Sequence, residues 1–193
     1  MPTFQETEAV LRTLSKIRKI EGSLIEELAQ PVTVEDPLES LIKALKSDWI
    51  LSVQGYFINH RPSSPYAQLD DEYKVQDLIF CLASSLVPDL HFENPRQKTT
   101  GALTSTRVDF SSQSRKMLLE VKLATDTHRA KKIESEMSED IVKYGKRKLF
   151  DTLIFFIFCH KYTFPNRSQF ETGFTGVQEI DGHRFQIICI VKP

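Results

Sequence analysis

Apolar residues recur at intervals of three and four along the first half of the chain, a pattern that predicts helices. The first thirty residues carry such a stripe, and Pro31 ends it. A second helix is predicted over residues 36–49, because Asp36 can cap its first turn. A third is predicted over residues 71–87, after a loop over residues 59–69 that is rich in Pro and Ser.

The period of the apolar residues changes to two from Thr104 onward, which predicts strands. Two alternating segments separated by a polar turn indicate an antiparallel hairpin. A continuous apolar run further along is typical of a strand buried on both faces. The predicted elements are strands at residues 104–110 and 117–124, joined by a turn at 111–114, then a charged helix at 129–148 and strands at 152–159 and 185–191.

The polar face of this hairpin carries the residues best suited to chemistry. Asp109 ends the first strand, and Glu120 and Lys122 share one face of the second. Two carboxylates at a strand edge suit Mg²⁺, which takes few protein ligands and keeps the rest of its coordination for water and substrate phosphate. The spacing alone is equally compatible with a solvated sheet face that holds a cross-strand ion pair.

The residues around this triad resemble a known family. Residues 107–110, Arg-Val-Asp-Phe, and residues 119–122, Leu-Glu-Val-Lys, are similar to the core motif of the PD-(D/E)XK phosphodiesterases, the restriction endonuclease-like superfamily. Val108 stands where the motif's name has proline, which leaves the acidic positions intact. The resemblance implies an α/β restriction endonuclease-like core with a mixed sheet of about four or five strands flanked by helices, and an N-terminal helical extension.

The resemblance covers about residues 71–193. Residues 72–78 resemble the helix that precedes the motif, where Glu72 matches an acidic residue that approaches the metal. Residues 139–144 resemble the helix after the motif. There Asp140 and Tyr144 stand at the positions of a Gln-x-x-x-Tyr element, with Asp in place of Gln.

The resemblance also implies the composition of the site. Asp109, Glu120, the main-chain carbonyl of Val121 and Glu72 would hold Mg²⁺, for which Mn²⁺ would substitute. Lys122 would position or deprotonate the attacking water, or hold the phosphate. Beside a divalent cation the pKa of Lys122 should be lowered by like-charge repulsion.

These expectations describe a metal-dependent endonuclease that hydrolyses DNA phosphodiester bonds in restriction or antiphage (antiviral) defence, with RNA left open as a substrate. Residues 1–58 are expected to form a helical region and residues 70–193 the nuclease-like domain. The alternative is a catalytically silent nucleic-acid-binding or scaffolding subunit of a larger defence complex. The intact triad argues against this alternative, because a degenerate member should have lost at least one of the three residues.

Composition adds a local signal for nucleic acid. The net charge of −1 excludes binding by overall basicity, but residues 115–148 hold ten Lys and Arg against six Asp and Glu. Arg107, Lys143, Lys146 and Arg147 are the expected phosphate contacts. A solvated helix face with internal ion pairs explains much of the same pattern.

The remaining features concern location and assembly. No apolar run approaches the length of a membrane span and the N-terminus is polar, so a cytoplasmic protein without membrane contact is expected. The three cysteines, Cys81, Cys159 and Cys189, lie in apolar runs and are predicted to be buried free thiols. The N-terminal helix needs a partner surface, which is the body of the same chain, a second subunit in a homodimer, or a larger effector complex.

Overall fold

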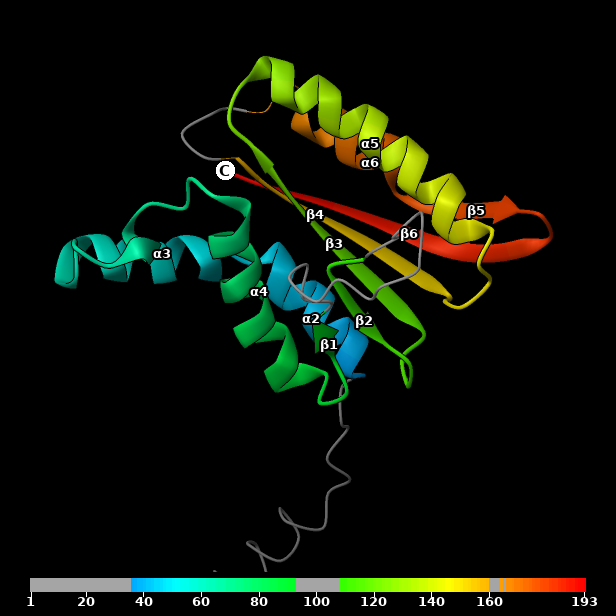
Figure 1. The fold of residues 1–193 in the computed structure, drawn as a ribbon, viewed down its shortest axis with the longest axis horizontal. Helices are drawn as coiled ribbons and strands as arrows, with labels where there is room; N and C mark the ends of the chain where they lie inside the picture. The colour runs from blue at the N-terminus through cyan, green and yellow to red at the C-terminus, as the bar shows by residue number, and fades with distance from the viewer. Residues whose placement is uncertain (1–35, 93–107, 160–163, 165) are drawn as a thin grey trace, which may run out of the picture. The chain divides into compact units, whose positions relative to one another are not determined.

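The computed structural model describes residues 36–92, 108–159, 164 and 166–193. Residues 36–193 form one compact unit built around a mixed sheet with the strand order β1-β2-β3-β4-β6-β5 (Figure 1). The inner strands β3, β4 and β6 run parallel, and the outer pairs are antiparallel. The strands are β1 (His91–Phe92), β2 (Phe110–Ser112), β3 (Met117–Ala124), β4 (Thr152–Cys159), β5 (Gly176–Ile180) and β6 (His183–Lys192).

Strand β4 lies at the centre of the sheet, and all eight of its residues are buried. This confirms the prediction from its apolar run, because a strand covered on both faces has no polar side to show. The mixed α/β class is also confirmed. The sheet has six strands, more than the expected four or five, because the sequence did not signal the short edge strands β1 and β5.

Helices cover both faces of the sheet (Figure 1). On one face α4 (Glu72–Leu86) packs against β3, and α2 (Pro37–Lys46) and α3 (Trp49–His60) share a hydrophobic core with Leu119, Val121 and Leu123 of that strand. On the other, α5 (Thr127–Gly145) and α6 (Arg167–Phe174) cover the second hydrophobic core. Because side chains alternate along a strand, Glu120 and Lys122 project toward the α5 face.

The helix predicted over residues 36–49 is wrong in one respect, since the chain forms two helices there. Asp36 caps α2 as expected, accepting a hydrogen bond from the Leu38 N–H at 2.8 Å. Ser47 then adopts an extended backbone and ends α2. Its hydroxyl donates to the Ala44 carbonyl at 2.7 Å and accepts from the Trp49 N–H at 3.4 Å, so one side chain satisfies backbone groups on both sides of the break.

The antiparallel hairpin is present, since β2 pairs with the first residues of β3, but its first strand is displaced from the prediction. Of the described residues 108–110 only Phe110 belongs to β2, and Asp109 precedes the strand instead of ending it. The strand continues to Ser112, one residue beyond the predicted start of the turn, and residues 104–107 lie outside the described residues. Asp89 holds the turn by accepting hydrogen bonds from the Ser112 hydroxyl at 2.8 Å and the Ser114 N–H at 2.9 Å. The Ser114 N–H and the hydroxyls of Ser112 and Ser114 lower the pKa of Asp89 to about 2.

Other predictions differ in their outcome. Cys159 and Cys189 are buried as expected, but the prediction for Cys81 is wrong, because it lies on the exposed side of α4. The predicted N-terminal helix falls outside the described residues, so the division into residues 1–58 and 70–193 stays a prediction. Within the described residues, α2 and α3 belong to the same compact unit as the sheet.

Gly145, the last residue of α5, lies against the tip of the β5–β6 hairpin. A Cβ built at this position would stand 2.7 Å from Ile180 Cδ1 and 3.0 Å from Phe185 Cε1. Gly145→Ala is therefore expected to lower the free energy of unfolding by about 1–3 kcal/mol, as overpacking does, despite the better helix propensity of alanine. Gly55→Ala in α3 is the matched control, because nothing lies within 4 Å of its Cβ, and it should be neutral or stabilising. Denaturant unfolding of both variants checks this, and equal stability would contradict it.

Candidate active site

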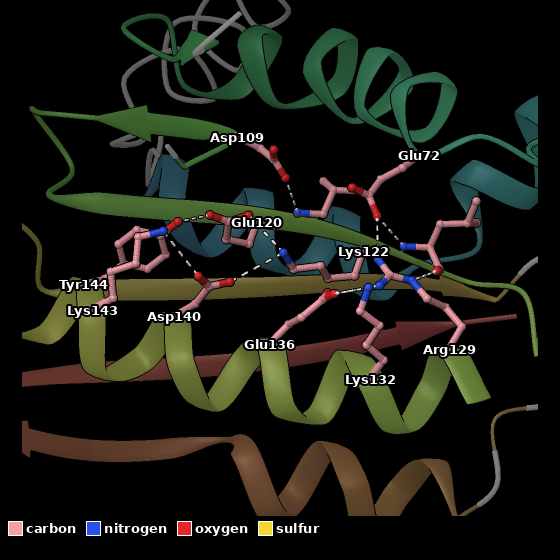
Figure 2. A network of polar contacts seen from close by, with 12 residues as sticks. Glu72, Asp109, Glu120, Lys122, Arg129, Lys132, Glu136, Asp140, Lys143 and Tyr144 are labelled. Carbon is pink, nitrogen blue, oxygen red and sulfur yellow. Dashed lines mark hydrogen bonds and ion pairs between the residues drawn. The ribbon is translucent and has the colours of Figure 1, made fainter. Parts of the chain in front are cut away.

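Past the end of β2, backbone N–H groups at the edge of β3 donate to carboxylates instead of to a neighbouring strand. β2 pairs with β3 only as far as Leu119. The next two outward N–H groups, those of Val121 and Leu123, donate to Asp109 Oδ2 at 2.8 Å and to Glu72 Oε2 at 3.0 Å (Figure 2). The strand backbone thus holds one oxygen of each carboxylate and sets the position of the other.

The same edge also presents a main-chain oxygen. The N–H and C=O groups of one strand residue point to the same side, so the carbonyl of Val121 faces the edge on which Asp109 lies. β2 does not extend to cover it, because its pairing ends at Leu119. The backbone that positions Asp109 therefore offers an additional oxygen beside it.

Glu120 and Lys122 lie on the sheet face toward α5 (Figure 2). The hydroxyl of Tyr144 donates to Glu120 Oε1, while Lys122 Nζ lies 3.7 Å from Glu120 Oε2 and 3.5 Å from Asp140 Oδ2. Glu120 is almost fully buried, with 3 % of its surface exposed. Asp140 and Tyr144 are four residues apart, so α5 presents both on one face.

Glu72 belongs to a second network at the N-terminal end of α5 (Figure 2). Arg129 lies with its guanidinium 3.5 Å from Glu72 Oε2 and 2.8 Å from Glu136 Oε1. Its Nε also donates to the Leu123 carbonyl at 3.3 Å. Arg129 thereby links α4, β3 and α5, and Glu72 is held at the edge of β3 by two different groups.

The two central carboxyl groups have perturbed acidities. Burial raises the pKa of Asp109, although hydrogen bonds from Val121 and the charge of Lys122 oppose this. Burial and the neighbouring Asp109 raise the pKa of Glu120 to about 8. Ionising both carboxyl groups costs free energy, because Glu120 is buried and lies beside Asp109.

The cost of ionising Glu120 predicts how the free energy of unfolding changes with pH. Because the folded protein binds the Glu120 proton up to about pH 8, against an ordinary pKa of 4.5, ionisation destabilises the fold as pH rises between these values. In EDTA, Glu120→Gln should therefore gain stability relative to the native protein from pH 5 to pH 8.5, by on the order of 1 kcal/mol or more. Denaturant unfolding at the two pH values measures this, with the exposed Glu139→Gln as control. A difference independent of pH would contradict it.

The pKa values of Lys122, Glu72 and Tyr144 are also shifted, by burial and by the charges of the same cluster. Burial acts to lower the pKa of Lys122, but the carboxylates of Glu120 and Asp140 outweigh it and raise the pKa above its usual value. The metal-free protein thus shows the opposite direction to that expected beside a cation. Burial raises the pKa of Glu72, and burial with the Glu120 charge raises that of Tyr144, which keeps the phenol protonated as a donor.

The donor set fits a hard divalent cation. Within the described residues no group of three or more His, Cys, Asp or Glu is arranged as a ready-made metal cage. Asp109, Glu120 and the Val121 carbonyl nevertheless supply only oxygen, and Mg²⁺ needs few protein ligands because it retains water. A cation between the two carboxylates would also offset the cost of ionising them, which burial imposes on both and the charge of Asp109 increases for Glu120.

Comparison with known proteins identifies the family. The family model described as REase_DpnII-MboI matches residues 40–192, which is most of the chain. The chain belongs to the DpnII-MboI restriction endonuclease family. No curated protein and no solved structure matches it.

Membership of the DpnII-MboI family confirms the expected restriction endonuclease-like fold, with which the mixed six-stranded sheet agrees. It also supports a DNA endonuclease that acts in restriction. The matched region contains all four acidic and basic residues named from the motif, Glu72, Asp109, Glu120 and Lys122. None of the described helices is both long and apolar enough to cross a membrane.

The residues expected to contact phosphates differ in exposure in this DpnII-MboI family member. Arg107 lies outside the described residues. Lys143 is half-buried, lying 3.6 Å from Asp140 Oδ1 with its ammonium over the ring of Tyr144. Lys146 and Arg147 are exposed directly after the end of α5.

Two contributors were not predicted from the sequence. Gln76 is buried on α4 one turn after Glu72, and its side chain acts to lower the pKa of Asp109. Arg129 lies in the charged helix predicted over residues 129–148, and its guanidinium contacts two carboxylates and a carbonyl. The spacing of Glu72 and Gln76 on α4 was a usable signal for the first, whereas the partners of Arg129 come from three elements.

Proposed function

We propose that this protein is a divalent-metal-dependent DNA endonuclease of restriction or antiphage defence, in which Asp109, Glu120 and the Val121 carbonyl hold Mg²⁺. The observation that supports this most is the grouping of the half-buried Asp109 and the buried Glu120 beside the ammonium of Lys122. Two carboxylates withdrawn from water beside one lysine are costly as a purely structural feature. They are well suited to a site that gains a cation and a phosphate.

A cation held by Asp109, Glu120 and the Val121 carbonyl would supply Lewis-acid stabilisation of the phosphate and lower the pKa of water. Lys122 contributes a donor that can hold the attacking water or a non-bridging phosphate oxygen, since its ammonium lies beside Glu120. Glu72 adds negative charge at the edge of β3, near Lys122 and Asp109. Mn²⁺ should substitute for Mg²⁺, because the ligands are carboxylate and carbonyl oxygens.

The binding surface and the setting belong to the same proposal. Arg107, Lys143, Lys146 and Arg147 are proposed to contact DNA phosphates, with Lys146 and Arg147 the two that the structure shows exposed. The protein is proposed to act in the cytoplasm, where incoming DNA is met. The N-terminal helices are proposed to pair two subunits or to join a larger effector, so that two sites can cut two strands.

The experiment is incubation of the purified protein with plasmid DNA, single-stranded DNA and RNA, each with Mg²⁺, Mn²⁺ or EDTA. We expect endonucleolytic cleavage of duplex DNA with either metal and none with EDTA. Gly55→Ala in α3, whose added Cβ meets no atom within 4 Å, is the active control. Stable DNA binding without cleavage under every metal condition would replace this proposal with the catalytically silent subunit, and cleavage confined to RNA would overturn the substrate.

A further inference from the structure

We propose that α5 positions the two site residues of β3 that face it. Tyr144 orients the Glu120 carboxylate toward the metal, and Asp140 holds Lys122 in place when Glu120 binds that metal. This inference rests on the proposed metal-dependent function and deepens it. Both are positioning residues, because each acts through a residue of β3.

The first contact involves a rigid donor. Tyr144 is 1 % exposed, and its ring packs in the second hydrophobic core. A phenol has few rotatable bonds, so core packing fixes the hydroxyl that donates to Glu120 Oε1. This hydrogen bond sets the rotation of the Glu120 carboxylate and leaves Oε2 for another partner. The orientation that a metal ligand needs is thus present before any metal arrives.

The second contact involves a flexible cation. Lys122 has a four-carbon stem, and its position depends on the groups that its ammonium contacts. In the structure these are Glu120 Oε2 at 3.7 Å and Asp140 Oδ2 at 3.5 Å. A cation that binds Glu120 competes for the first of these oxygens. Asp140 is not on β3, so it retains Lys122 beside the reacting groups after that competition.

Packing of α5 against the sheet fixes the positions of Asp140 and Tyr144. Ile133 and Met137 are fully buried on the same helix, which fixes α5 against the sheet. Asp140 is itself held, since Lys143 Nζ lies 3.6 Å from its other oxygen, Oδ1. Lys143 therefore supports the pair from the side opposite to Lys122. One helix turn between Asp140 and Tyr144 matches the two-residue step between Glu120 and Lys122 on the strand.

The first test is made on metal binding without DNA. Tyr144→Phe keeps the packed ring and removes the hydroxyl, so the protein should fold normally. Calorimetric titration should show Mn²⁺ binding weakened by about 10-fold or more, the usual effect of losing a group that orients a ligand. Asp140→Asn should leave Mn²⁺ affinity within about 3-fold of the native protein. Unchanged Mn²⁺ affinity in Tyr144→Phe would overturn its assigned role.

The second test separates kcat from KM on plasmid DNA at saturating Mg²⁺. Asp140→Asn should lower kcat by about 10–100-fold with KM unchanged, and Asp140→Glu should restore part of it. Glu139→Gln, the exposed neighbour on α5, is the control and should match the native protein. Native kcat in Asp140→Asn, or a change confined to KM, would overturn the proposed role of Asp140.

The third test needs no cleavage and therefore distinguishes this inference from the function on which it rests. In EDTA, Asp140→Asn and Lys122→Met should be non-additive in unfolding, because both remove the same ion pair. If the native protein binds Mn²⁺ but cuts no nucleic acid, the proposed function fails, while the calorimetric and unfolding results still decide the positioning roles. Additive unfolding effects would show that Asp140 does not hold Lys122.

Discussion

Asp109→Ala should reduce DNA cleavage by about 10³-fold or more and should also weaken metal binding. A bound cation contributes several kcal/mol to phosphodiester hydrolysis, and each 1.36 kcal/mol corresponds to a factor of ten in rate. Asp109 supplies negative charge that the cation requires, from a carboxylate whose Oδ2 is fixed by the Val121 N–H at 2.8 Å. Its loss also removes the partner of that N–H, so some loss of stability should accompany the catalytic defect.

Asp109→Asn separates the two effects. The amide oxygen can still accept from the Val121 N–H, while the negative charge is gone. We therefore expect near-native stability with metal binding and cleavage as impaired as in Asp109→Ala. Calorimetric titration with Mn²⁺, plasmid cleavage and denaturant unfolding of both variants measure this. If either variant bound Mg²⁺ or Mn²⁺ as tightly as the native protein, Asp109 would not be a metal ligand.

Local sequence pattern was sufficient for the elements that surround the site. β4 was predicted within its observed bounds because burial on both faces leaves an uninterrupted apolar run. The polar face of β3 was predicted because alternation of side chains is a property of the strand alone. Glu120 and Lys122 consequently share a face in the sequence and in the structure.

Elements without a strong local pattern were not predicted. α6 has eight residues, and only the partly buried Phe170 and Phe174 pack against the second core, so its apolar stripe is too short to predict a helix. The strand β5 was not predicted because none of its positions is fully buried. The break between α2 and α3 depends on the side chain of Ser47 satisfying backbone groups on both sides, which a periodic pattern does not reveal.

The partners of the site residues were the least accessible to sequence reasoning. Glu72 and Leu123 are separated by 51 positions, and Tyr144 and Glu120 by 24. Nothing local specifies such pairs, because they depend on how helices dock on the sheet. Resemblance to a family placed Asp140 and Tyr144 near the motif, but it did not indicate that Asp140 pairs with Lys122.

Lys122→Ala should abolish detectable turnover, or lower it by about 10²–10³-fold, while metal binding and DNA binding persist. Lys122 opposes the charge of a bound cation, so metal affinity does not depend on it. Its ammonium becomes useful only when a phosphate and a water are also present. The structure adds that its removal leaves Glu120 and Asp140, each within 4 Å of the ammonium, without their shared cation. The metal-free variant should therefore be less stable at neutral pH, and Mg²⁺ should recover part of that loss.

The contrast between the two alanine variants is the decisive measurement. Mn²⁺ titration should give near-native affinity for Lys122→Ala and weak binding for Asp109→Ala, although neither cuts plasmid DNA. Lys122→Arg distinguishes charge from geometry, because the guanidinium keeps the positive charge but replaces the compact ammonium beside Glu120 and Asp140 by a wider, planar group. We expect Lys122→Arg to regain stability without regaining activity. Full cleavage by Lys122→Ala would mean that the metal and its carboxylates suffice, and Lys122 would then serve only to balance the charge of Glu120 and Asp140.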